Sequence, residues 1–180
     1  MNTFVKLKSQ YEHSDSINTL EINNVSSTNE PSGLHTYMIE ISQIGEQLIL
    51  IGISFFLVGL IQGALIPSVK NSRMALSGHM TAVQSGMALA IFGVIWSLVD
   101  LPFTVEIFVA YASATGFILI WLGITIASVT GASKALPIAG AGFSSTAAKE
   151  LIVTIMVRGG SVISLISCTL LAFGLLPILW

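Results

Sequence analysis

Long apolar stretches and short polar segments alternate along most of this chain, after a polar beginning. The apolar stretches cover about residues 46–68, 76–98, 105–128 and 150–176. Each contains the roughly 20 residues that an α-helix needs to cross the hydrocarbon core of a bilayer. The pattern predicts an all-α membrane protein, with four transmembrane helices in a bundle.

The first 42 residues have a different character. They are polar and rich in Ser, Asn, Thr and Glu, as in the run Asn23-Asn-Val-Ser-Ser-Thr-Asn-Glu-Pro31. Such a segment buries too little apolar surface to compensate for the entropy of ordering the chain. We therefore expect a disordered tail over residues 1–42 and a transmembrane domain over residues 43–180.

Composition and charge support the membrane assignment and exclude other classes. Hydrophobic residues make up 53% of the chain and charged residues only 9%, against roughly 25% charged in ordinary globular domains. The net charge of -2 provides no basic field, so we expect no nucleic-acid partner. Membrane lipid is the expected surrounding, and a single cysteine excludes a disulfide within the chain.

The basic residues near the spans predict the orientation of the helices. The loops after the first and third spans carry Lys70, Arg73, Lys134 and Lys149, whereas the second loop carries Asp100 and Glu106. Basic loops stay in the cytoplasm according to the positive-inside rule. We expect a multi-pass protein of the cell membrane with both termini outside.

His79 is the one histidine beyond the polar tail, and it opens the second apolar stretch. An imidazole in hydrocarbon needs a hydrogen-bond partner, a proton path or a metal. A lone histidine cannot hold zinc, which takes three or four protein ligands, but it can ligate haem iron axially. The structural alternative is a histidine that is satisfied by a backbone carbonyl or a lipid headgroup.

The surroundings of His79 leave two interpretations open. On a helix its face carries Ala82, Val83, Gly86 and Ala90, a smooth groove for a flat cofactor or for a neighbouring helix. Ser85 lies about 120° around the helix from His79, so the two would serve different surfaces. Gln84, Ser85, Tyr111 and Thr115 could line a site, or they could join helices by hydrogen bonds.

Two motifs carry a resemblance to a known family. The first is Asn71-Ser-Arg-Met-Ala-Leu-Ser-Gly-His79 with the following Gly86-Met87, and the second is Leu136-Pro-Ile-Ala-Gly-Ala-Gly-Phe143 with Ala147-Ala-Lys-Glu150. Over about residues 45–175 the chain resembles hydroxylaminobenzene mutase, a family of small four-helix bacterial membrane proteins. It is more distantly similar to styrene oxide isomerase, a trimeric membrane enzyme with haem b between its subunits.

The resemblance implies an isomerase for a small hydrophobic aromatic substrate. The reaction would convert an N-aryl hydroxylamine into an aminophenol, or an aryl epoxide into an aldehyde. It implies haem b as cofactor, with iron as a Lewis acid on His79, and a homo-oligomer, a trimer by resemblance, in a bacterial inner membrane. The expected cofactor contacts are His79, Arg73 and Gly86; the expected catalytic residues are His79, Ser85 and Gln84; the expected substrate contacts are Tyr111, Thr115 and Phe117.

The chain also departs from the family pattern, and this keeps alternatives open. Ser85 replaces the asparagine of the family, although Gln84 beside it carries an amide. The third span reads Ala112-Ser-Ala-Thr-Gly-Phe117 where relatives have an aromatic-Ala-Asn cluster. The alternatives are a haem-binding or purely structural membrane protein without activity, and a transporter of small apolar solutes.

Overall fold

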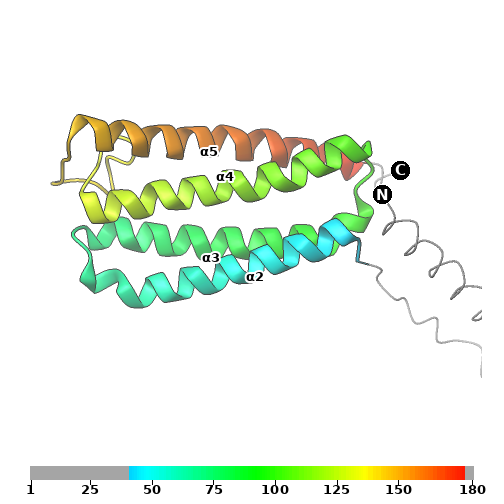
Figure 1. Ribbon diagram of the computed structural model, residues 1–180, viewed down its shortest axis with the longest axis horizontal. Coiled ribbons are helices and arrows are strands. Elements are labelled where there is room, and N and C mark those ends of the chain that lie inside the picture. Colours follow the sequence, from blue (N-terminus) through cyan, green and yellow to red (C-terminus); the bar gives the residue numbers. More distant parts are fainter. Residues whose placement is uncertain (1–40, 177–180) are drawn as a thin grey trace, which may run out of the picture. The chain divides into compact units, whose positions relative to one another are not determined.

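The computed structural model describes residues 41–176, and the predicted tail over residues 1–42 lies outside them except for Ile41 and Ser42. Labels follow Figure 1. The described chain forms the helices α2 (Gln43–Leu65), α3 (Ser72–Ile95), α4 (Phe103–Thr130) and α5 (Ala147–Gly174), with short 3-10 turns η1 (Ile66–Ser68) and η2 (Trp96–Leu98).

The four helices run antiparallel as two hairpins that lie side by side (Figure 1). α2 packs along α3, α4 packs along α5, and a smaller contact between α3 and α4 joins the two pairs. The loops over residues 66–71 and 131–146 meet at one end of the bundle, and the connection over residues 99–102 lies at the other. The predicted all-α bundle is therefore confirmed for the described residues.

All four helices are long and apolar enough to cross a membrane. They begin two to four residues earlier than the apolar stretches indicated. The reason is that polar residues occupy the first helical turns, and in α2 and α3 a polar side chain also caps the helix. The Ser42 hydroxyl accepts a hydrogen bond from Gly45 N at 3.1 Å, and the Asn71 side chain accepts one from Met74 N at 3.1 Å. Such caps satisfy the free N–H groups of a helix end and set its first residue.

Glycines set the close contacts within each hairpin. A Cβ atom on Gly52 would lie 2.6 Å from Gly86 O, and one on Gly160 would lie 2.7 Å from Gly116 O. Backbones therefore touch at these crossings of α2 with α3 and of α4 with α5. Small residues permit this approach, which favours helix association in lipid through van der Waals contact.

Much of the outward surface of the bundle is apolar. On α5, for example, Ile155 is 62% exposed and Leu165 is 69% exposed. In water such a surface would be unfavourable, but it matches the acyl chains of a bilayer. Buried apolar side chains form one cluster around Leu89 and Trp96 and a second around Met74 and Val153.

Candidate functional site

His79 lies in α3 and faces α2, where its ring is half-buried. Its Nδ1 atom lies 2.7 Å from Gly59 O. Because a carbonyl oxygen only accepts hydrogen bonds, Nδ1 carries the proton, and Nε2 of the neutral ring then holds the free lone pair. Ligating histidines commonly have this arrangement, with the second nitrogen fixed by a carbonyl or a carboxylate.

A glycine of α2 makes room for the His79 ring. A Cβ atom on Gly63 would lie 2.9 Å from both Nδ1 and Cε1 of His79. The neighbouring positions show the reverse arrangement, with the glycine on α3 and the polar side chain on α2. A Cβ atom on Gly78 would lie 2.7 Å from Nε2 of Gln62. Each helix thus supplies one polar side chain and one glycine, so that both side chains fit between closely packed backbones.

Gln62 connects this region to α4. Trp121 donates its indole N–H to Gln62 Oε1 at 2.6 Å, and Gln62 Nε2 donates to Thr125 Oγ1 at 3.1 Å. Phe55 packs edge-on against the Trp121 ring, with ring centroids 5.3 Å apart. This network fixes α2, and with it Gly59 and Gly63, against α4.

Sequence reasoning missed Gln62, Trp121 and Thr125. The available signal was the amide of Gln62, which lies in an uncharged and almost wholly apolar stretch. Polar side chains at membrane depth need partners, and the nearest ones come from other helices. An amide, an indole and a hydroxyl at similar depth on two spans were therefore the pattern to look for.

The smooth face below His79 contacts a neighbouring helix. Within the described residues, Gly59 of α2 lies against Ala82 and Val83, and Gly52 lies against Gly86 and Ala90. Of the two interpretations left open by the sequence, the helix contact is the one observed inside the chain. Gly86 therefore touches the α2 backbone, and its contact with a cofactor stays a prediction.

The remaining predicted site residues are spread over different surfaces. Ser85 is buried in α3, Gln84 is exposed, and Thr115 is exposed on α4. Tyr111, one turn before Thr115, is 54% exposed and donates to Gln47 Oε1 at 3.1 Å. Phe117 is half-buried against Phe92, with ring centroids 6.4 Å apart.

The two sequence motifs meet at the loop end of the bundle. Asn71 is buried and donates from Nδ2 to Ala139 O at 3.0 Å, and Arg73 donates to Ala141 O at 3.0 Å. Buried Glu150 accepts hydrogen bonds from Ser133 N and Lys134 N at 2.9 to 3.1 Å. These contacts fold the loop over residues 131–146 against the start of α3.

This tethered loop forms one wall of a pocket of about 490 Å³. Its lining combines Arg73 and Ser77 with the apolar segment of residues 135–139. Arg73 and Ser77 lie six and two residues before His79, which corresponds to about 9 Å and about 3 Å along the helix axis. The guanidinium has five N–H donors, of which the Ala141 contact uses one.

Comparisons with known proteins agree with the resemblance. The profile of the styrene oxide isomerase family matches residues 44–176. Hydroxylaminobenzene mutase HabB of Ectopseudomonas oleovorans is 31% identical over 150 residues, 79% of this chain and 87% of that protein. Hydroxylaminobenzene mutase HabA of the same organism is 36% identical over 106 residues, 58% of this chain and 78% of that protein. No solved structure matches the chain.

The matched family and both mutases are isomerases, and together with the four apolar spans they indicate a small helical membrane enzyme of the isomerase class. The chain belongs to the styrene oxide isomerase family. The predicted resemblance is confirmed.

Proposed function

We propose that this protein rearranges a small hydrophobic aromatic substrate within the cell membrane, with haem b bound at His79. The substrate is an N-aryl hydroxylamine, converted to an aminophenol, or an aryl epoxide, converted to an aldehyde. The single observation that carries the proposal is the hydrogen bond between His79 Nδ1 and Gly59 O at 2.7 Å, because it leaves Nε2 as a free ligand atom.

His79 would hold haem iron through Nε2, since the porphyrin itself supplies four nitrogens and a single protein ligand suffices. The Gly59 carbonyl fixes the ring orientation, and Gly63 leaves the space that the ring occupies. Arg73, with most of its donors free of the loop contact, is suited to a haem propionate. When bound, haem iron would supply Lewis acidity toward an N–O or epoxide oxygen.

The chain's own polar groups would then orient the substrate. The Tyr111 hydroxyl donates to Gln47 and keeps acceptor capacity, and the Thr115 hydroxyl lies on the same face of α4 one turn later. The Phe117 ring packs against Phe92 of α3, and Ser85 and Gln84 also lie on α3. Because substrate and product have the same atoms, no reductant or oxidant takes part.

Exposed polar groups at membrane depth support a homo-oligomer. Gln84, Tyr111 and Thr115 are exposed on the single chain, within spans that lipid would otherwise surround. Polar side chains that face hydrocarbon are unfavourable, so a second copy is the expected cover. A trimer, as the resemblance implies, would bring such surfaces together and complete the substrate pocket.

Turnover without a reductant tests the proposed function. Haem-loaded protein in detergent is incubated with phenylhydroxylamine or styrene oxide, and the isomeric product is quantified. We expect conversion by the wild type and by Gly159→Ala, since a Cβ on Gly159 meets no atom within 4 Å. We expect His79→Ala to lose at least 100-fold in rate. A folded, haem-loaded wild type that converts neither compound would contradict the proposal.

A further inference from the structure

Among residues 41–176, Arg158 is the one charged residue in the interior of a span, since the others lie in loops or in the first turn of a helix. It follows Ala147, the first residue of α5, by about 16 Å along the helix axis. The 28 residues of α5 measure about 42 Å, against a hydrocarbon core of about 30 Å. A centred helix therefore places the backbone of Arg158 roughly 10 Å inside the hydrocarbon.

Arg158 has no partner within the described part of the chain. Its side chain is exposed, and no hydrogen bond or ion pair joins its guanidinium to another of residues 41–176. Thr154 and Ser161, on the same face of α5, instead donate their hydroxyl protons to carbonyls of their own helix, at 2.6 and 2.7 Å. A charge in hydrocarbon is unfavourable unless it is paired, so the guanidinium requires an acceptor from outside the chain.

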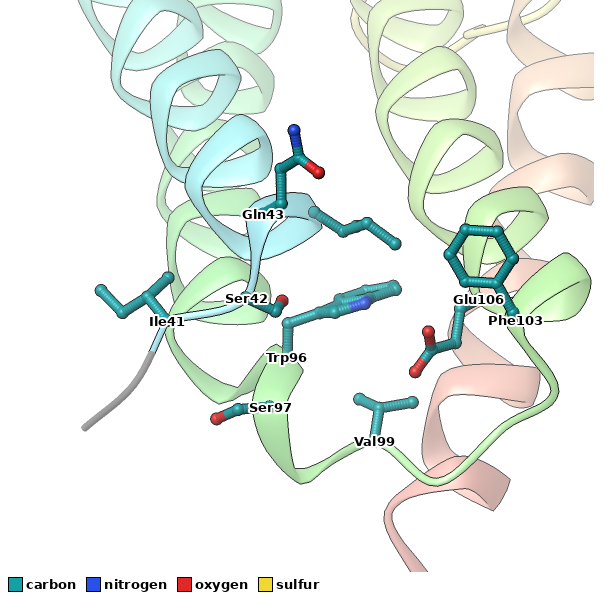
Figure 2. A pocket seen from close by; sticks show the side chains of 9 residues that line it. Ile41, Ser42, Gln43, Trp96, Ser97, Val99, Phe103 and Glu106 are labelled. Atoms are coloured by element: carbon teal, nitrogen blue, oxygen red, sulfur yellow. The ribbon is translucent and has the colours of Figure 1, made fainter. Parts of the chain in front are cut away.

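A second copy in the same orientation does not offer a carboxylate at this depth. Of the four acidic residues in the described part, Glu46, Asp100 and Glu106 lie at the opposite end of the bundle. Figure 2 shows Glu106 there, in a pocket that it lines together with Trp96. The fourth, Glu150, is buried and accepts hydrogen bonds from the loop over residues 131–146. The acceptor therefore comes from the surroundings of the protein.

The nearest surroundings are those of the loop end. Side chains on a helix lean toward its N-terminus, and α5 begins at the loop end, so the long side chain of Arg158 extends toward that membrane surface. No acidic residue of the described chain is exposed at this end, whereas four basic residues are: Lys70, Arg73, Lys134 and Lys149. This end of the bundle is therefore suited to a leaflet that carries negative charge.

The side chains around Arg158 are suited to acyl chains. Leu151 and Leu165 lie seven residues to either side of it and so share its face of α5, and they are 60% and 69% exposed. Ile155 and Val162, 62% and 56% exposed, complete this face. A phospholipid combines a phosphate for the guanidinium with chains for the apolar side chains, whereas a soluble anion offers only the first.

We propose that α5 carries a binding site for an anionic phospholipid of the leaflet at the loop end. The guanidinium of Arg158 donates to the phosphate oxygens, an arrangement that its planar set of N–H groups favours. The acyl chains cover Leu151 and Leu165. The site uses none of the residues assigned to the isomerase reaction, so it stands whether or not that assignment holds.

Two lipids with the same chains test this site. The full-length protein in detergent is titrated with dioleoylphosphatidylglycerol or dioleoylphosphatidylcholine, and bound lipid is counted by native mass spectrometry. We expect the wild type to bind phosphatidylglycerol at least about fivefold more tightly, and inorganic phosphate should not displace it. Arg158→Gln should lose this preference.

Lys149→Gln is the matched control, because it removes one positive charge from the opposite side of α5. It should keep the preference for phosphatidylglycerol. An equal loss in the two variants would show that only the overall charge matters, and displacement by inorganic phosphate would show a site for soluble anions. Either result would overturn the proposal.

A contact between arginine and lipid phosphorus provides a second measurement, in case Arg158→Gln fails to fold. In Arg73→Lys protein, Arg158 is the one remaining arginine. This protein is labelled with nitrogen-15 at arginine and reconstituted in vesicles of either lipid for solid-state magnetic resonance. We expect lipid phosphorus to dephase the guanidinium signal strongly in phosphatidylglycerol and weakly in phosphatidylcholine. Equal dephasing in both lipids, or none in phosphatidylglycerol, would overturn the proposal.

Discussion

The position of the His79 ring depends on one hydrogen-bond acceptor and one missing methyl group. Gly59 O holds Nδ1, and Gly63 lies where a Cβ atom would be 2.9 Å from the ring. Nε2, the proposed ligand atom, is therefore oriented by two residues of α2 that need not themselves touch a cofactor. Such indirect partners of a ligating histidine typically change metal affinity 10- to 100-fold.

Gly63→Ala tests this dependence. The added methyl group should displace the ring and lower haem affinity by about 10- to 100-fold, which haem titration followed by absorbance measures. Gly159→Ala is the matched control, since its Cβ meets no atom within 4 Å. Equal haem affinity in the two variants would show that Gly63 does not position the ring.

The beginning of α3 is held by Asn71, the residue that precedes its first turn. Asn71 caps α3 through Met74 N and holds the loop through Ala139 O, so one side chain performs two tasks. The two motifs of the sequence contact each other here, where the loop over residues 131–146 folds onto the start of α3.

Two substitutions separate the two tasks of Asn71. Asn71→Ser keeps a capping oxygen and loses the loop contact, whereas Asn71→Ala loses both. We expect a loss of unfolding free energy of about 1 kcal/mol for Asn71→Ser and about 2 kcal/mol for Asn71→Ala. Chemical unfolding followed by circular dichroism measures both values. If the two variants were equally stable, the cap would contribute nothing.

The sequence predicts the number and nature of the helices better than it predicts their neighbours. Length and hydropathy suffice for a span, so the four helices followed directly from the pattern. The helices are apolar on nearly every side, and a pattern without a polar face does not tell which face meets which helix. For this reason the groove below His79 stayed ambiguous, and the partners of Gln62 were missed. The helices also begin a few residues earlier than the apolar stretches predict, because their first turns contain polar residues.

Across the whole molecule, polar and apolar exposed surfaces have different expected neighbours. The outer face of α5 is apolar at Ile155 and Leu165, as lipid contact requires, whereas α4 exposes Tyr111 and Thr115. A bundle with both kinds of surface is suited to assembly through the polar one.

Cross-linking between copies tests the proposed assembly. In a Cys168→Ser background, Thr115→Cys should cross-link copies of the chain, and Leu165→Cys should cross-link at least fivefold less. The mass of the detergent complex, measured by light scattering, should be that of a homo-oligomer, with three copies expected. A monomer, or equal cross-linking at both positions, would contradict the assembly.

The absorption spectrum of detergent-purified protein supplied with haem tests the role of His79 most directly. We predict a Soret band in the wild type that is lost in His79→Ala and returns when free imidazole is added to that variant, since imidazole replaces the missing ligand. An unchanged Soret band in His79→Ala, or no Soret band in a folded wild-type protein, would contradict the assignment of His79 as the haem ligand.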